Sequence, residues 1–419
     1  MSGASTLVSP STDVQQVPSG WSMEKLAALV NIVYGKSPAE IQRLGEGIPI
    51  FGTGGVVGYT CQALFDGPSI ILGRKGTIDK VQRCAGPFWA IDTTYYTTPK
   101  REFDWTWLYY AISSFDLRKL NEASGVPSLS RSSLEALDVA IPPLPEQLKI
   151  AAVLTAVDDK LDVTGRQIEA TQTFKQGLMQ TLFSRGVGTQ DANGRWVPHT
   201  DFKESGLGEI PATWVPTTLG AVCDGALQTG PFGSQLHAHE YQDEGVPVLM
   251  PKDLVGCRAT LSTAAHISLA RAEDLSKHKV LVGDLLFSRR GDVARFALID
   301  DKSEGALCGT GCLKARPSAA HSSAFLAQLL QLDVVRAWME QNAVGQTMPN
   351  MNTSILSSLP LVVPVDRREQ DEIARILDSI DSKLQVLAVK LSHLRRLKRG
   401  LMQKLLKGEW RVSLGAIAT

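Results

Sequence analysis

The chain contains the stretch EQLKIAAVLTAVDDKLDVTGRQIEATQTFKQGLMQTLF, Glu146–Phe183, in two versions. A shift of 223 positions (369 − 146) aligns it, without a gap, with EQDEIARILDSIDSKLQVLAVKLSHLRRLKRGLMQKLL, Glu369–Leu406. The residues of the first version that recur in the second are Glu146, Gln147, Ile150, Ala151, Leu154, Asp158, Lys160, Leu161, Val163, Lys175, Gly177, Leu178, Met179, Gln180 and Leu182. So many identities at one shift indicate an internal repeat.

Both versions have the spacing of a long amphipathic helix. In the second, apolar residues follow one another at alternating steps of four and three, which places them on one side of a helix: Ile373, Leu377, Ile380, Leu384, Leu387, Leu391 and Leu394. The first keeps this register at Ile150, Leu154, Val157, Leu161 and Ile168, with Thr164 and Thr171 interrupting it. At about 1.5 Å per residue each helix would be about 57 Å long, and its apolar side needs a partner. We therefore expect the two helices to pack against each other.

The composition is that of an ordinary globular protein. The chain has 419 residues, of which 43% are hydrophobic and 21% are charged, enough for roughly two to four domains. Basic and acidic residues number 43 each, so the net charge is zero. This balance argues against a protein that coats DNA without regard to sequence, although a local basic surface would still bind DNA.

The sequence favours a cytoplasmic location. It has no run of about 18 apolar residues and no signal segment at its start. The cysteines lack the spacing of a disulfide framework, which is typical of a protein in a reducing compartment. They are Cys61, Cys84, Cys223, Cys257, Cys308 and Cys312.

The segments outside the helices repeat a second plan. Pro18-Ser-Gly-Trp21 returns as Pro211-Ala-Thr-Trp214, ILGRKGTI as LLFSRRGDV, and Pro127-Ser-Leu-Ser130 as Pro349-Asn-Met-Asn352. A helical pattern over 104–120 returns over 322–340, and Asp366 with Glu369 resembles a capping box at the start of the second long helix. The expected organisation is a flexible N-terminal arm (1–17), a first mixed domain (18–144), the first helix (145–185), a second mixed domain (186–365), the second helix (366–408) and a C-terminal tail (409–419).

This organisation predicts an α+β protein with two mixed α/β domains, separated by two long antiparallel coiled-coil helices and related by a pseudo-two-fold repeat. Two similar but non-identical domains suit a DNA target with two half-sites of different sequence. A helix of about 57 Å limits the separation of the half-sites to about 17 base pairs at about 3.4 Å each.

The repeated helix ending in GLMQ, the paired Pro-x-x-Trp segments, IPIFGTGGVVGY before GRKGTIDKV, and GDLLFSRRGDVARFALI before LCGTGCLKAR together resemble the specificity subunit of bacterial type I restriction–modification systems. The resemblance runs from about Trp21 to about Leu406 and rests on the order and duplication of the motifs. It implies two target-recognition domains on a non-catalytic subunit. It also implies partners: double-stranded DNA, two methyltransferase subunits and restriction subunits. No cofactor is expected on this chain, since S-adenosylmethionine, ATP and Mg would be bound by the partners.

Candidate DNA contacts lie mainly in two equivalent turns. Turns project side chains, and arginine or lysine there can grip phosphate or a guanine edge. The candidates are Arg74, Lys75, Lys80 and Arg83 in the first domain and Arg289, Arg290 and Arg295 in the second, with Ser234 and Gln235, and Lys36 and Ser37, in separate loops. The alternatives are solvated basic turns and plain surface loops.

Candidate helix-packing or partner-contacting residues occupy matching positions in the two helices: Leu154, Leu161, Gly177 and Leu178, with Leu377, Leu384, Gly400 and Leu401. A mid-helix glycine costs about 1 kcal/mol relative to alanine. Its repetition predicts close backbone approach, by the other helix or by a partner. The basic residues between Lys383 and Lys407, where no acidic residue occurs, form either a phosphate-facing stripe or a solvated or partner-facing side.

Catalytic signatures are missing. Gly35-Lys36-Ser37 has Val30 where a phosphate-binding loop requires glycine, and no Asn- or Asp-Pro-Pro-aromatic motif of adenine methyltransferases occurs. Cys308-Gly-Thr-Gly-Cys312 has the wrong spacing for a zinc site and is better explained as buried strand residues. No metal site is expected. Two alternatives stay open: a stand-alone enzyme acting on DNA, and a coiled-coil adaptor that binds only protein.

Overall fold

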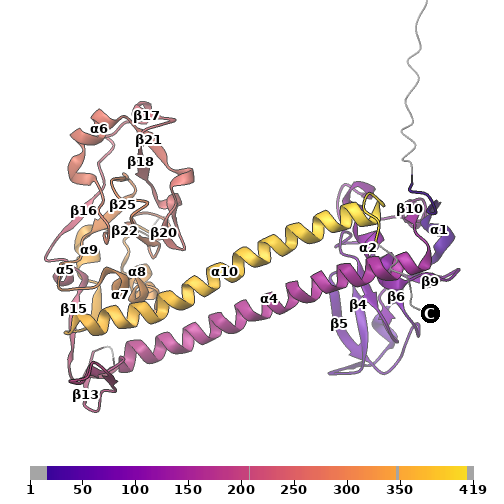
Figure 1. Cartoon of the computed structure of the whole chain (residues 1–419), viewed down its shortest axis with the longest axis horizontal. Coiled ribbons are helices and arrows are strands. Elements are labelled where there is room, and N and C mark those ends of the chain that lie inside the picture. The colour runs from indigo at the N-terminus through magenta and orange to yellow at the C-terminus, as the bar shows by residue number, and fades with distance from the viewer. Residues whose placement is uncertain (1–16, 207, 346–348, 413–419) are drawn as a thin grey trace, which may run out of the picture. The chain divides into compact units, whose positions relative to one another are not determined.

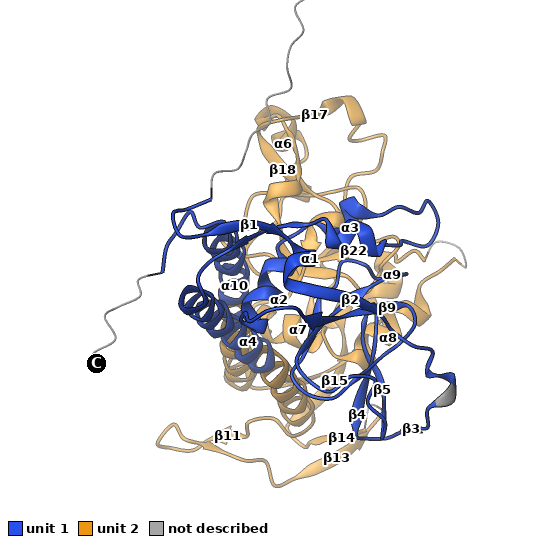
Figure 2. Ribbon diagram, turned by 90° about the vertical axis from the view of Figure 1, so that its right-hand side faces the viewer, with its two compact units in different colours: residues 1–167, 387–419 blue, residues 168–386 orange. Residues whose placement is uncertain are grey.

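The computed structural model describes residues 17–206, 208–345 and 349–412. The chain divides into two compact units (Figure 2): unit 1 comprises residues 1–167 and 387–419, and unit 2 comprises residues 168–386. The expected N-terminal arm, except residue 17, and the tail beyond residue 412 lie outside the described residues. Within the described ranges, no helix is long and apolar enough to cross a membrane.

The repeated stretches form the two longest helices, α4 (Leu144–Arg185) and α10 (Arg367–Leu406) (Figure 1). Pro145 lies in the first turn of α4, where its missing N–H costs no hydrogen bond. Gly186 follows α4 with a φ of +69°, a left-handed conformation that commonly ends helices.

In each unit an ion pair connects the two helices. In unit 1, Lys398 of α10 binds Asp158 of α4, with 2.7 Å between Nζ and Oδ1. In unit 2, Lys175 of α4 binds Asp381 of α10, also at 2.7 Å. Shifting Asp158 and Lys175 by the 223-residue repeat gives Asp381 and Lys398. The two ion pairs are therefore the same contact made twice.

The helices run antiparallel where they meet in each unit. In unit 1, Glu146 at the start of α4 binds Arg411, which follows the end of α10. In unit 2, Glu369 at the start of α10 accepts a hydrogen bond from Val187, just past the end of α4. Since residue numbers rise along one helix as they fall along the other, the predicted antiparallel arrangement is confirmed.

The apolar sides of the helices complete the cores of the units. Ile150, Ala151 and Leu154 belong to the core of unit 1, and their counterparts Ile373, Ala374 and Leu377 belong to the core of unit 2. Burial falls in the second half of α10, where the side chain of Leu397 is 49% exposed, and returns at its end, where Leu405 and Leu406 join the core of unit 1. At the end of α4, Met179 and Leu182 likewise join the core of unit 2. Both the start and the end of each helix are therefore integral parts of the cores.

In unit 1 a short antiparallel strand pair joins the beginning of the domain to its end: β1 (Ser22–Lys25) pairs with β10 (Asp138–Ile141). The central sheet has the order β2 (Val30–Tyr34), β9 (Thr94–Pro99), β6 (Ser69–Gly73), β7 (Gln82–Cys84). The second sheet has the order β3 (Arg43–Leu44), β5 (Gly55–Thr60), β4 (Ile48–Gly52), β8 (Trp89–Ala90). The helices are α1 (Leu26–Leu29), α2 (Trp105–Ser113) and α3 (Arg131–Glu135). Trp107 and Tyr110 of α2 are buried in the core.

Unit 2 repeats this plan with additions. Its pair is β15 (Trp214–Thr218) with β26 (Pro360–Pro364). The six-stranded sheet is β16 (Leu227–Thr229), β25 (Cys312–Ala315), β22 (Leu285–Ser288), β23 (Phe296–Leu298), β20 (Cys257–Ala259), β19 (Leu254–Val255), so its first four strands match β2, β9, β6 and β7. A four-stranded sheet is β17 (Tyr241–Gln242), β21 (Ala265–Ile267), β18 (Val246–Leu249), β24 (Leu307–Cys308).

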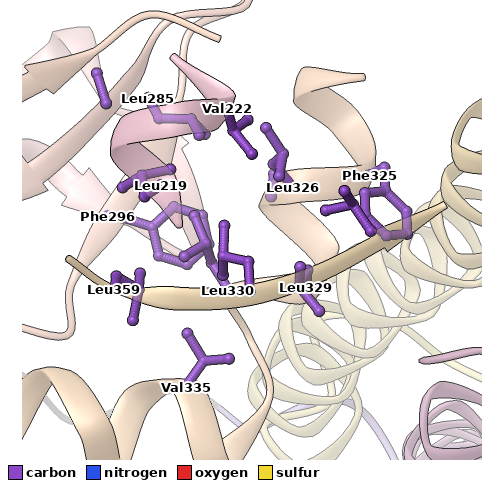
Figure 3. Close-up of a cluster of buried hydrophobic side chains, with 14 of the residues drawn as sticks. Leu219, Val222, Leu285, Phe296, Phe325, Leu326, Leu329, Leu330, Val335 and Leu359 are labelled. Atoms are coloured by element: carbon purple, nitrogen blue, oxygen red, sulfur yellow. The ribbon is translucent and has the colours of Figure 1, made fainter. Parts of the chain in front are cut away.

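The described part of unit 2 also contains two hairpins and five α-helices, besides short 3₁₀ helices. The hairpins are β11 (Thr189–Gln190) with β12 (Trp196–Val197) and β13 (Phe202–Ser205) with β14 (Gly208–Pro211). The helices are α5 (Leu219–Val222), α6 (Leu269–Asp274), α7 (Ser323–Leu329), α8 (Asp333–Asn342) and α9 (Thr353–Ser357). The core joins sheet residues such as Phe296 to Phe325 and Leu326 of α7 (Figure 3).

Two helices are shorter than the sequence predicts. The helix expected over 104–120 stops at Ser113, and a 3₁₀ turn follows at Leu117–Leu120. The helix expected over 322–340 is two helices, because Leu332 is extended (φ −62°, ψ 137°). One extended residue does not disturb the spacing of apolar side chains, so periodicity alone could not reveal the break.

The capping-box prediction at α10 is correct for Asp366, whose Oδ1 accepts a hydrogen bond from Arg368 N at 2.9 Å, but wrong for Glu369. The carboxylate of Glu369 accepts hydrogen bonds from Trp214 Nε1 (3.0 Å) and lies 2.8 Å from His199 Nε2. In unit 1 the matching carboxylate of Glu146 accepts a hydrogen bond from Trp21 Nε1 at 2.9 Å. The repeated tryptophan and the repeated glutamate are therefore partners, which join the start of each domain to the start of its helix.

Candidate nucleic-acid interface

The turns after β6 and β22 have the same construction. In unit 1, Gly76 N donates to Pro127 O (2.8 Å) and Leu129 N donates to Arg74 O (2.9 Å). In unit 2, Gly291 N donates to Pro349 O (3.2 Å) and Met351 N donates to Arg289 O (2.8 Å). The turns place Gly76 and Gly291 at φ +98° and +74°, where side chains other than hydrogen are strained. The repeated Pro-x-x-x segments thus hold the repeated basic turns.

The first arginine of each turn lies over an aromatic ring. The guanidinium carbon of Arg74 is 5.3 Å from the ring centroid of Tyr34, and that of Arg289 is 5.7 Å from the centroid of Phe232. The rings are 49% and 53% exposed, respectively. Guanidinium groups within about 6 Å of a ring face are held by the ring quadrupole. Both arginines are therefore oriented before any ligand binds.

Glycine brings these rings into place. A Cβ on Gly35, directly after Tyr34, would lie 2.0 Å from Ile91 O, and one on Gly230 would lie 1.8 Å from Gly309 O. Gly35 thus lets the loop after β2 contact the backbone just before β9, and Gly230 lets the loop after β16 contact the backbone just before β25. Sequence reasoning missed the two aromatic residues. The available signal was an aromatic residue next to a glycine at the end of β2 (Tyr34-Gly35) and shortly after β16 (Phe232-Gly233).

The second basic residue of each turn faces solvent. Lys75 and Arg290 are exposed, and their side chains make no ion pair or hydrogen bond with the residues that the structure describes. Arg74 donates to Asp92 O at 2.8 Å. The buried Nε of Arg289 has no partner among the described residues. Each turn therefore combines an oriented arginine with a free cation, a combination suited to guanine edges and phosphates.

The other basic candidates are engaged within the domains. Lys80 donates to Gly54 O, and Arg295 donates to Pro251 O at 3.2 Å, so both tie their turn to a neighbouring loop. Arg83 donates to Thr106 Oγ1 at 2.8 Å and lies over the ring of Tyr109, on α2 rather than at the turn. The structure does not bring Arg83 together with the other candidates.

The loop candidates lie at the same end of the central sheets as the turns. β2 and β6 both run antiparallel to β9, so the loop with Lys36 and Ser37 and the turn with Arg74 leave the sheet at one edge. Lys36 and Ser37 are exposed. In unit 2 the strand order is the same, and Ser234 is exposed. Gln235 Oε1 accepts a hydrogen bond from Phe232 N at 3.1 Å, so this amide oxygen already closes its own loop.

The helix positions divide into buried and open ones. Leu154 and Leu377 are fully buried, and Leu161, Leu178, Leu384 and Leu401 are half-buried. Around Gly177 and Gly400, no described atom lies within 4 Å of an added Cβ, apart from those of the glycine's own turn. Close approach by the other helix, one of the two predicted reasons for these glycines, is therefore wrong. Approach by a partner stays a prediction.

The alternative sites are not supported by the described residues. Burial raises the pKa of the Cys308 thiol to about 12 and that of Cys312 well above its usual range, as expected of core residues. No group of three or more metal-ligating side chains occurs in the described part of the chain. Of the basic residues in the second half of α10, Lys398 pairs with Asp158 and Lys404 with Glu409, whereas Lys390, Arg395, Arg396 and Arg399 are exposed, as is Lys407 just after the helix.

Comparison with known proteins identifies the family. The family described as type I restriction modification DNA specificity domain matches residues 18–172 and 211–395, most of both repeats. The chain belongs to this family. The predicted resemblance to type I specificity subunits is thus confirmed, as is a non-catalytic role in such a system.

Individual relatives of this specificity subunit match along nearly its whole length. The type I restriction enzyme MjaVIII specificity subunit of Methanocaldococcus jannaschii is 24% identical, over 95% of this chain and 94% of that one. The EcoDI specificity subunit of Escherichia coli is 21% identical over 94% and 89%. The crystal structure of the S subunit from M. genitalium covers 95% of this chain and 98% of its own, with a TM-score of 0.65 and 16% identity, which confirms the fold.

Proposed function

We propose that this specificity subunit reads the two halves of an asymmetric, bipartite DNA target, one half with each domain. The observation that carries the proposal is the duplicated basic turn. Arg74-Lys75 and Arg289-Arg290 have the same backbone bonds and the same aromatic support, although the loops that supply the rings differ in sequence. Equivalent supports with different neighbouring side chains suit two half-sites of different sequence.

The subunit would also carry its partners. Two methyltransferase subunits and the restriction subunits would bind it, and S-adenosylmethionine, ATP and Mg would be bound by those partners. The open surroundings of Gly177 and Gly400 and the exposed cations Arg395 and Arg399 of α10 support the use of the long helices as docking surfaces. The same helices would set the distance between the half-sites, because a continuous helix has a fixed rise per residue. The assembly would act in the cytoplasm.

Adenine-methylation mapping tests the proposal. Cells that express the methyltransferase subunit with and without this chain are compared for N6-methyladenine across the genome. We expect methylation at one bipartite motif, present only with this chain. Unchanged methylation in its absence would refute the proposal.

A gel shift distinguishes direct reading from the alternative of a protein adaptor. The assembled complex is titrated with DNA that contains the mapped motif and with two matched DNAs, each with one half scrambled. Reading by both domains predicts weaker binding to both scrambled DNAs. If this chain is an adaptor without DNA readout, the methyltransferase complex should bind all three DNAs equally, with or without this chain.

A further inference from the structure

A surface hollow occurs at the same place in each unit. In unit 1, a hollow of about 600 Å³ lies between the end of α2, β10 and the last turns of α10. In unit 2, a hollow of about 170 Å³ lies between the end of α7, β26 and the last turns of α4. These elements are counterparts in the repeat, so the duplication has preserved a depression as well as the fold.

The lining residues correspond position by position. Leu406, the last residue of α10, and Lys407 just after it are the counterparts of Phe183 and Ser184 of α4 by the 223-residue shift. The strand residues Asp138, Val139 and Ala140 match Pro360, Leu361 and Val362, since β1–β10 and β15–β26 pair in the same register. Apolar side chains form part of the lining of each hollow, called its floor below: Ala111, Val139 and Leu406 in unit 1, and Phe183, Leu361 and Val362 in unit 2. The unit 2 hollow is smaller because Val334, Val335 and Trp338 of α8 also line it.

The rims differ in charge. Arg395, Arg399 and Lys407 line the unit 1 hollow, are exposed, and form no ion pair with any described residue. Asp138, the acidic residue at this rim, already binds Lys25 at 2.7 Å. By the 223-residue shift, Gln172, Gln176 and Ser184 replace the three cations. Of these, Ser184 lines the unit 2 hollow, whose rim also carries Glu209, 3.8 Å from Arg185.

We propose that both hollows anchor the same segment of the methyltransferase subunit, presented by its two copies, and that this segment carries an apolar side chain flanked by carboxylates. The inference rests on the proposed function. In unit 1 an apolar floor under a rim of cations suits such a segment, because the anchor is buried while the carboxylates meet the rim. In unit 2 the apolar floor takes the anchor without these cations. The phosphate backbone of DNA would leave the floor unfilled. The unequal rims make the unit 1 site the tighter of the two.

Blocking each hollow separately tests the proposal. Lys407→Trp and Ser184→Trp place a bulky side chain at matching exposed positions, so neither should unfold the chain, which circular dichroism melting checks. The full-length chain is titrated with the purified methyltransferase subunit and followed by calorimetry and native mass spectrometry. We expect two unequal binding steps for the unaltered chain. Lys407→Trp should remove the tighter step and Ser184→Trp the weaker.

A charge-matched pair of variants tests the rim. In about 0.1 M salt, where charges act over about 10 Å, Arg395→Gln/Arg399→Gln should weaken only the tighter step, by about fivefold to tenfold. Lys390→Gln/Arg396→Gln removes two exposed charges of the same helix outside the hollow and should change neither step.

Several results would overturn the proposal. Two unaltered binding steps in both tryptophan variants would show that the hollows do not bind the methyltransferase subunit. The proposed reading of DNA would not be affected by that result. An equal loss of affinity in the two charge variants would show that the rim contributes only through the overall charge of the helix. A dimer of this chain that Lys407→Trp disrupts would make a second copy the occupant. If the unaltered chain binds no methyltransferase subunit, the proposed function fails together with this inference.

Discussion

Replacing Lys175 by methionine should destabilise the chain more than the matching replacement of Lys398. Lys175 is 9% exposed, and its ammonium lies 2.7 and 2.8 Å from the two carboxylate oxygens of Asp381. Removing one partner of a buried ion pair costs about 3–5 kcal/mol. Since the Asp381 side chain is 32% exposed and keeps a 2.8 Å hydrogen bond from Gln328, we expect about 2–3 kcal/mol.

The matching pair in unit 1 is more exposed, at 26% for the Lys398 side chain and 31% for Asp158, and Tyr110 also donates to Asp158 at 2.8 Å. Lys398→Met should therefore cost only about 1 kcal/mol. Urea unfolding of the two variants and the unaltered chain measures both losses. Methionine keeps most of the apolar stem, so lost packing contributes little. Equal losses, or a larger loss for Lys398→Met, would refute this reasoning about burial.

A double variant separates the ion pair from other effects. Lys175→Met/Asp381→Leu removes both charges, and replacing a buried pair by apolar residues is often close to neutral. We expect it to recover at least half of the stability lost in Lys175→Met. Losses that simply add would show that the two side chains are not coupled.

The remaining predictions concern the aromatic supports, the end of the chain and the helices. Tyr34→Leu and Phe232→Leu should each lower the preference for the correct bases of one half-site by about twofold to fivefold in binding competition, since an exposed cation–π contact contributes about 0.5–1 kcal/mol. Tyr109→Leu, which removes the α2 ring beneath Arg83, should change the preference at neither half-site. Arg411→Met removes the cation from the buried carboxylate of Glu146, which keeps its hydrogen bond from Trp21, and should lower the free energy of unfolding by about 1–2 kcal/mol in thermal melts. Seven residues inserted at matching points of both long helices should lengthen the spacer in the methylated motif by about three base pairs, because two helical turns add about 10.5 Å; an unchanged spacer would contradict the helices' role in setting it.

The sequence predicted the repeat and the helices because their spacing is local. Residues four and three apart define one side of a helix whatever surrounds it, and Ile150, Leu154, Ile373 and Leu377 are indeed buried. The same logic failed at Leu332, where one extended residue breaks a helix without changing the apolar spacing.

The partners of individual side chains could not be predicted, because they depend on contacts across many residues. Glu369 is separated from Trp214 by 155 positions, so its spacing from Asp366 suggested a cap instead. The stacking of Arg74 on Tyr34 similarly requires three strands to bring two loops to one sheet edge. The repetition itself contained the missing signal, since Trp21 with Glu146 and Trp214 with Glu369 recur together.

The most direct test maps the methylated motif after replacing each basic turn. Arg74→Ala/Lys75→Ala and Arg289→Ala/Arg290→Ala are expressed separately with the methyltransferase subunit, and the adenine methylome of each strain is sequenced. Contacts of about 1–3 kcal/mol per base are large enough to change it. We expect one half of the motif to become degenerate in the first variant and the other half in the second. Degeneracy of both halves in either variant, or an unchanged motif in both, would contradict the assignment of one half-site to each domain.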